Sequence, residues 1–236
     1  MLRRILSCLA VAALIMSSEQ SSFSQENAMV EANKKQIPVS YIENRGQWSP
    51  AVKFMAQLRG MTVWFTDKGL KYDVYTSRPA NAAEIKQEKT RLLRINKEAA
   101  GKLESGNPMQ RSGQVIEMEL VGAAKLAVTG MEQQTSYRNY FIGRDKTKWQ
   151  TGVPVFSKLH SEEVYPGIDV VYSFQAGKPR YDFVVKPGAN PSLISLRFNG
   201  ANSVSVSADK GITLSTKLGD MYNGNIYAYQ TINGRE

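Results

Sequence analysis

The chain has 236 residues, a formal net charge of +9, one cysteine and one histidine. A single cysteine excludes a disulfide framework, and a total of one cysteine and one histidine excludes a clustered zinc site. The positive charge does not indicate a nucleic-acid partner, because residues 76–114, which carry about half of the surplus, mix eight basic residues with four acidic ones. The length suffices for one large β domain or two small ones.

A short apolar stretch near the N-terminus has the form of a secretory signal. Arg3 and Arg4 precede the apolar core ILSCLAVAALIM, whose twelve residues would rise only about 18 Å as a helix, against a bilayer core of about 30 Å. We expect a signal peptide over residues 1–24, a flexible leader over 25–37 and no transmembrane segment in the mature chain. The alternative is an uncleaved anchor. The expected location is therefore extracellular or at the cell surface.

From residue 38 the sequence is typical of a β domain. The segments VKFMAQL (52–58), MTVWFT (61–66) and LKYDVYTS (70–77) alternate apolar and polar residues and are rich in β-branched and aromatic types. Gly60 and the Asp67-Lys68-Gly69 stretch supply turns between them. The same pattern returns after Gln114, so we expect a mainly β fold over residues 38–236.

One charged segment interrupts the strands. Asn81 and Glu84 have the spacing of a capping box at a helix start. The apolar residues that follow can share one helical stripe: Ile85, Leu92, Ile95, Ala99 and Leu103. We predict a helical insertion at about residues 79–105, with Gly101 ending the helix or fraying its last turn. The alternative is a charged, partly disordered loop.

An internal sequence repeat predicts two similar halves. IEMELVGAAKLAV from Ile116 aligns without a gap to ISLRFNGANSVSV from Ile194, and a Tyr-Asp strand precedes each of them, at Asp73 and at Asp182. Two related β units would pack as a sandwich around a shared core. We therefore predict a β-sandwich of two similar halves with one helical insertion. Chance likeness between amphipathic strands is the alternative.

Catalytic, cofactor and metal-ligating residues are not predicted anywhere in the chain. His160 and Ser161 are sequence neighbours, which point to opposite faces of a strand, so they cannot serve as base and nucleophile. No calcium-loop motif and no phosphate-binding glycine loop is present. The alternative is a glycosidase-type pair drawn from Glu162, Glu163, Asp169 and Asp182.

We expect structural roles for the carboxylates near the VYPGID turn. Asp169 directly follows Pro166 and Gly167, and the Tyr-Asp pair recurs in both halves, which suggests a backbone hydrogen bond at a strand end. The predicted structural motif comprises Tyr165, Pro166, Gly167, Asp169, Tyr181 and Asp182. The candidate ligand contacts are Trp48, Trp64 and Trp149, which could form a platform for stacking sugars or could pack in the core.

Four stretches together resemble one uncharacterised domain: ENRGQW (43–48), NYFIGRDKTKWQTGVP (139–154), VYPGIDVVY (164–172) and YDFVVKPGANPSLISLRFNGA (181–201). It is the N-terminal domain of large exported bacterial proteins with β-propeller-type (SBBP) repeats, often followed by PKD or other immunoglobulin-like modules and a C-terminal sorting domain. The resemblance covers about residues 38–236, apart from the helical insertion. It implies no catalytic residues. Asn190 departs from the aspartate usual in that pattern, and the chain stops where relatives continue, so we expect a truncated sequence.

The expected function is non-enzymatic. We expect an extracellular module of a larger bacterial cell-surface or secreted protein, acting in scaffolding or adhesion, or binding glycans or partner proteins at the cell surface. The alternative is a carbohydrate-active hydrolase using an Asp/Glu pair. No nucleic-acid partner and no cofactor are expected.

Overall fold

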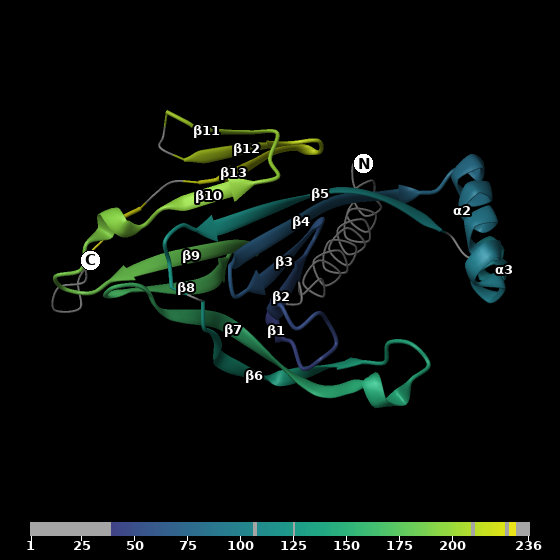
Figure 1. Cartoon of the computed structure of the whole chain (residues 1–236), viewed down its shortest axis with the longest axis horizontal. Helices are drawn as coiled ribbons and strands as arrows, with labels where there is room; N and C mark the ends of the chain where they lie inside the picture. Colours follow the sequence, from purple (N-terminus) through teal and green to yellow (C-terminus); the bar gives the residue numbers. More distant parts are fainter. Residues whose placement is uncertain (1–38, 106–107, 125, 209–210, 225–226, 230–236) are drawn as a thin grey trace, which may run out of the picture. The chain divides into compact units, whose positions relative to one another are not determined.

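The computed structural model describes residues 39–105, 108–124, 126–208, 211–224 and 227–229 (Figure 1). The predicted signal peptide (1–24) and leader (25–37) lie outside the described residues. No helix in the described ranges has both the length and the hydropathy needed to cross a bilayer.

The described elements are mostly strands. They follow in chain order as β1 (Tyr41–Glu43), β2 (Val52–Leu58), β3 (Met61–Thr66), β4 (Gly69–Pro79), α2 (Ala82–Ile95), α3 (Lys97–Ser105), β5 (Met109–Leu120), β6 (Val128–Tyr140), η1 (Lys146–Lys148), β7 (Gln150–Tyr165), β8 (Ile168–Gln175), β9 (Lys178–Val185), η2 (Pro191–Leu193), β10 (Leu196–Asn199), β11 (Ser203–Val206), β12 (Ile212–Thr216) and β13 (Gly219–Asn223). The predicted mainly β class with a helical insertion is confirmed. The strands predicted at 52–58 and 61–66 match β2 and β3.

Ten of the described strands form one antiparallel sheet that divides at β7. The order is β10-β5-β4-β3-β2-β1-β7-β8-β9, with β6 along the remaining edge of β7. Val155 and Phe156 of β7 pair with β1, whereas the segment from Leu159 to Tyr165 pairs with β8. Since β6 lies opposite both of these segments, β1 and β8 share one edge of β7. The sheet therefore separates into a layer containing β1–β5 and β10 and a layer containing β8 and β9.

Aromatic contacts join the two layers across one core. The ring of Tyr41 in β1 stacks on Phe174 in β8 with centroids 4.5 Å apart, and its hydroxyl donates to the carbonyl of Ser173 at 2.9 Å. Phe65 of β3 meets Tyr172 of β8 edge to face at 5.1 Å. Alternate residues of the strands line this core, among them Phe54, Ala56, Val63, Leu70, Ile116, Met118, Leu159, Ile168 and Val170. Each fully buried aliphatic side chain contributes roughly 1.5–3 kcal/mol.

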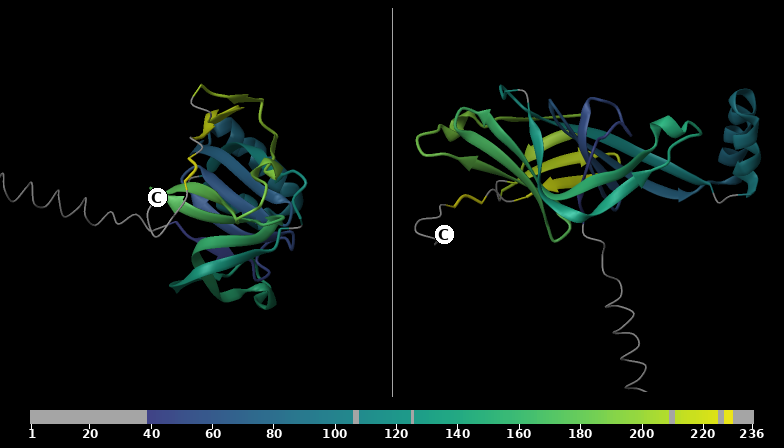
Figure 2. Two further views of the ribbon diagram at one scale, coloured as in Figure 1. Left: turned by 90° about the vertical axis from the view of Figure 1, so that its left-hand side faces the viewer. Right: turned by 90° about the horizontal axis from the view of Figure 1, so that it is seen from below.

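A second, three-stranded sheet in the order β11-β12-β13 extends the core (Figures 1 and 2). Leu214 of β12 is buried with the main core residues. The side chain of Gln114 in β5 donates to the carbonyl of Gly200 at 2.5 Å and accepts from the backbone N–H of Lys217 at 2.7 Å. These contacts attach the small sheet to the layer formed by β4, β5 and β10.

The helical insertion consists of two helices at the far end of the β4–β5 ribbon (Figures 1 and 2). The predicted capping box is present, because Asn81 accepts from the N–H of Glu84 while the Glu84 carboxylate accepts from the N–H of Asn81. The predicted end at Gly101 is wrong, since Gly101 lies inside α3. The break falls at Asn96, whose N–H donates to Leu92 and whose side chain accepts from Ala99.

The two predicted halves correspond over one strand and its following turn. β5 and β10 are paired neighbours, with Leu120 opposite Leu196. Each strand leads to a glycine with positive φ, at +74° for Gly122 and +85° for Gly200. The likeness ends beyond the turn: Val128 packs against the core, whereas its counterpart Val206 is 74 % exposed.

Gly69, the first residue of β4, lies where a side chain would clash with β5. Its φ is +143°, and a Cβ there would lie 2.1 Å from the carbonyl oxygen of Met118 in β5. Gly122 also has positive φ, but a Cβ there would meet open space. Substitutions at these two glycines therefore distinguish the cost of positive φ alone from the added cost of a clash between β4 and β5.

We expect Gly69→Ala to destabilise the protein by about 3 kcal/mol or more, because β4 and β5 must move apart as well as accept strain. Gly122→Ala should cost only about 1–2 kcal/mol, the penalty of the left-handed conformation. Urea unfolding followed by circular dichroism measures both. Equal losses for the two variants would contradict the described contact between β4 and β5.

Candidate functional site

Three aromatic rings gather on the outer face of the β1–β5 layer. Trp48 follows β1, Trp64 lies in β3 and Tyr140 ends β6. The ring of Trp48 meets Trp64 edge to face at 5.6 Å and Tyr140 at 5.3 Å. The rings are half-buried and pack on a small apolar cluster of Ile42, Met55, Val153 and Val155. We call Trp48, Trp64 and Tyr140 the ring cluster.

Strand alternation explains why Trp64 faces outward. Its neighbours Val63 and Phe65 are both buried in the main core, so Trp64 must point to the opposite side of the sheet. Met55 lies directly across from Trp64 on β2 and shares this face. The ring cluster therefore lies on the side of the sheet that β8 and β9 do not cover.

A single amide holds the loop that carries Trp48. The Nδ2 of Asn44 donates to the carbonyls of Ser49 at 2.9 Å and Val52 at 2.8 Å. Its Oδ1 accepts from the backbone N–H groups of Gly46 at 3.0 Å and Trp48 at 3.2 Å. The ENRGQW motif thus closes a loop and fixes the position of its tryptophan.

A cavity of about 480 Å³ opens beside this loop. Its aromatic walls are Trp48, Phe54 and Phe156, and its polar lining includes Glu43, Lys53 and Thr129. Phe156 lies against Gly130, where a Cβ would come within 2.5 Å of the ring. Aromatic walls with a few polar groups are typical of small-ligand sites.

Trp149 belongs to a different ring pair. It meets Phe141 edge to face at 5.2 Å, and its indole N–H donates to the carbonyl of Gly143 at 3.2 Å. The structure therefore unites two of the three predicted tryptophans. It adds Tyr140, which no sequence pattern singled out, because only the pairing of β6 with β7 brings it to Trp48.

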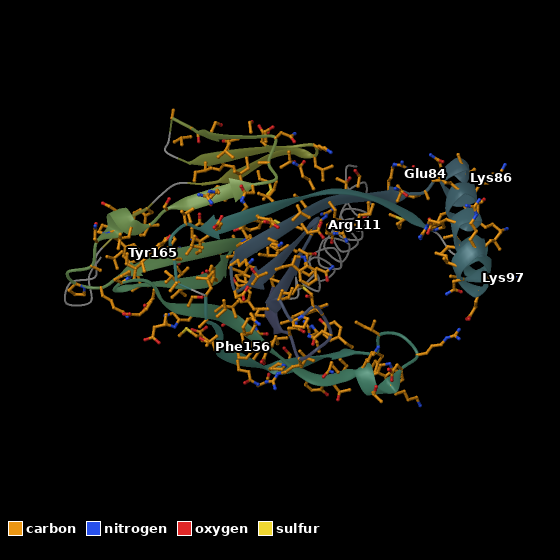
Figure 3. The ribbon with its side chains drawn as sticks, in the orientation of Figure 1. Glu84, Lys86, Lys97, Arg111, Phe156 and Tyr165 are labelled. Atoms are coloured by element: carbon orange, nitrogen blue, oxygen red, sulfur yellow. The ribbon has the colours of Figure 1, made fainter. Side chains whose placement is uncertain are left out.

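The VYPGID segment forms the hairpin turn between β7 and β8. Tyr165 and Ile168 pair across Pro166 and Gly167, and Gly167 has a φ of +71° that suits the second central turn position. The Tyr165 hydroxyl lies 3.1 Å from the carbonyl oxygen of Val121 and 3.2 Å from that of Ser195 (Figure 3). This tyrosine therefore ties the β7–β8 turn to the ends of the opposite layer.

Asp169 stabilises a bulge next to that turn. Its carboxylate accepts from the backbone N–H of Glu163 at 2.8 Å and pairs with Lys186 at 3.1 Å, while His160 Nε2 lies 3.5 Å away. Glu163 has a φ of +48° where the β7–β8 register shifts, so the carboxylate holds a strained residue in place. The Glu163 N–H and then the Lys186 ammonium lower the pKa of Asp169. A general acid needs the opposite shift.

The recurrent Tyr-Asp pairs place the tyrosine inward and the aspartate outward. Asp73 pairs with Arg111 at 2.6 Å and Asp182 with Arg180 at 2.7 Å. The sequence predicted that these aspartates accept backbone hydrogen bonds at strand ends, but their partners are arginine side chains. Both aspartates lie within strands, and the arginines are on the same outward face. Tyr181 packs against the core, and its hydroxyl accepts from the side chain of Asn223 at 2.6 Å.

Three of the four carboxylates proposed for a hydrolase, Glu163, Asp169 and Asp182, are paired with cations. Asp169 lies opposite Val184 and Asp182 opposite Val171, which makes the two aspartates diagonal neighbours across β8 and β9, roughly 7–8 Å apart. That spacing suits a glycosidase, but each carboxylate already has a cationic partner. Ser161 is fully buried and His160 faces the other side of β7. Within the described ranges, no group of three or more His, Cys, Asp and Glu side chains is placed to hold a metal ion.

Replacing Asp169 with asparagine tests the bulge role. A carboxylate whose pKa is lowered in the folded state stabilises the protein at pH values above the unfolded-state pKa of about 3.9. This stabilisation is lost as pH falls. We expect Asp169→Asn to cost about 1 kcal/mol or more at pH 7. The gap in unfolding free energy between wild type and variant should shrink as pH falls below about 5 and through the folded-state pKa of Asp169, as measured by urea unfolding. Asp182→Asn, at a partly exposed pair, should cost less than about 1 kcal/mol; a constant gap for Asp169→Asn would contradict the assignment.

Comparison with known proteins gives one positive result. A search of curated proteins found no match, and a search of solved structures found none. A family model described as a domain of unknown function, DUF7948, matches residues 41–236, which include every strand described above. The chain therefore belongs to the DUF7948 family of domains of unknown function.

Proposed function

We propose that this chain is a non-enzymatic, extracellular carbohydrate-binding module of a larger bacterial cell-surface or secreted protein. The observation that carries the proposal is the ring cluster of Trp48, Trp64 and Tyr140 on the outer face of the sheet. Sugar rings present apolar C–H faces that pack on aromatic side chains, and hydroxyl groups that need polar partners.

The surroundings of the ring cluster supply those polar partners. Trp48 belongs both to the ring cluster and to the wall of the 480 Å³ cavity, so a sugar on its ring would lie close to Glu43 and Lys53. Asn44 holds the Trp48 loop through four close hydrogen bonds. A ring that is already fixed loses little conformational entropy on binding, which favours affinity.

The extracellular part of the proposal rests on the sequence. The N-terminal pattern of residues 1–24 is that of a secretory signal. The resemblance to the N-terminal domain of exported SBBP-repeat proteins supports a module that is joined to further domains. In such a protein this domain would attach the whole molecule to a glycan or hold a partner at the cell surface.

The hydrolase alternative has weaker support than the binding role. Asp169 has a lowered pKa through the Glu163 N–H and Lys186, and Asp182 forms a multidentate pair with Arg180. Neither aspartate lines the 480 Å³ cavity. The arrangement is thus suited to holding strands together rather than to transferring protons.

A glycan-array screen of the purified chain, followed by titration of the best ligand, tests the binding role. We expect Trp64→Leu to weaken binding on the order of tenfold or more, because it removes the ring while keeping an apolar side chain on Met55. Trp149→Leu is the matched control, since Trp149 lies outside the ring cluster, and it should bind as wild type does.

Three results would contradict the proposal. The first is equal loss of binding in the Trp64 and Trp149 variants, and the second is no glycan binding by the folded wild type. The third is hydrolysis of the bound glycan that disappears in Asp169→Asn, which would establish the enzyme instead.

A further inference from the structure

The tip of the β6–β7 ribbon exposes two large apolar residues side by side. Phe141 is 60 % exposed and Ile142 is 54 % exposed, and both lie in the loop of residues 141–149. Scattered single apolar residues are ordinary on a protein surface, but an adjacent pair at a projecting tip indicates a contact site. We call residues 141–149 the ribbon tip.

Cations follow directly after this apolar pair. Arg144, Lys146 and Lys148 lie within the ribbon tip, and the side chains of Arg144 and Lys148 are 87 % and 78 % exposed. The one acidic residue of the ribbon tip, Asp145, caps η1 by accepting from the N–H and hydroxyl of Thr147, and it lies 3.9 Å from the Lys148 ammonium. The ribbon tip therefore presents apolar side chains next to an excess of positive charge.

Internal contacts keep the ribbon tip ordered. Trp149 packs edge to face on Phe141 and donates its indole N–H to Gly143. The Lys146 ammonium lies 5.7 Å from the centroid of the Trp149 ring. The apolar pair is thus held outward by a small closed loop, so presenting it to a partner costs little additional ordering.

The helical insertion adds a similar surface at the same end of the β domain. Figure 3 shows Lys86 and Lys97 on the two helices, beyond the end of the sheet and on the side toward which the ribbon tip projects. Leu93 and Ile95 are exposed, and α2 buries none of its residues. Arg144 of the ribbon tip pairs with Glu98 of α3, which joins the two projections.

We propose that this end of the domain docks on an anionic phospholipid surface, with Phe141 and Ile142 entering the interface and Lys146 and Lys148 contacting lipid phosphates. Apolar side chains flanked by lysine and arginine match the two layers of a membrane interface, the acyl boundary and the charged headgroups. Lysine is depleted at protein–protein interfaces, which argues against a protein partner for this surface. The proposal does not depend on the ring cluster or on glycan binding.

Vesicle flotation with the purified chain tests the docking. We expect binding to vesicles of 70 % phosphatidylcholine and 30 % phosphatidylglycerol, weak binding to pure phosphatidylcholine, and release at about 0.5 M salt, where charge is screened within a few ångströms. Phe141→Ser with Ile142→Ser should weaken binding roughly tenfold or more, through lost apolar area. Lys146→Gln with Lys148→Gln should weaken it about thirtyfold, through two lost cations.

A matched control keeps the test specific. Val204→Ser with Val206→Ser removes two exposed apolar residues from β11, far along the chain from the ribbon tip, and should leave vesicle binding unchanged. Failure of the wild type to float with the anionic vesicles, or equal losses for the control and ribbon-tip variants, would overturn the proposal. So would a concentration-dependent dimer that disappears in the Phe141/Ile142 variant, because a second copy would then be the occupant.

Discussion

The fold depends on one strand forming ladders with three others. Along one edge β7 pairs with β6, and along the other it pairs first with β1 and then with β8. A strand cannot pair with two partners at the same residues of one edge, so the sheet must divide where β1 ends and β8 begins. The division folds one layer over the other, and it brings Tyr41 and Phe65 against the rings of β8. The core between these two layers follows from this change of partner.

The same division decides what the two outer faces can do. Residues that alternate with the core positions of β1–β3 must face away from β8, and they include the apolar and aromatic side chains of Ile42, Met55 and Trp64. On the outer face of β7–β9, the alternate positions include His160, Asp169 and Asp182 as well as two valines, and both aspartates are paired with neighbouring cations. One outer face therefore carries the ring cluster, and the other carries ion pairs that hold its own strands and a strained bulge.

Local elements could be predicted from the sequence because their causes are local. Alternation and turn residues predicted β2 and β3 with their ends, and the Asn81–Glu84 spacing predicted the start of α2. The break at Asn96 was missed, because the apolar stripe continues across it as it would in one uninterrupted helix. Asn96 ends α2, and its side chain caps α3. The ring cluster was predicted only in part. Tyr140 and Trp48 are about ninety residues apart in sequence and meet because β7 pairs with both β6 and β1, and no local pattern encodes that register.

The helical insertion shows how separately parts of one domain can be stabilised. β4 and β5 pair along their full length, from Gly69 with Glu119 to Pro79 with Met109, so the sheet's hydrogen bonds do not pass through α2 or α3. The helices in turn pack mainly on each other. A protease that nicks the chain within the helical insertion would therefore leave two fragments that remain associated through the β4–β5 ladder and the common core, and the cut domain would still unfold as one unit.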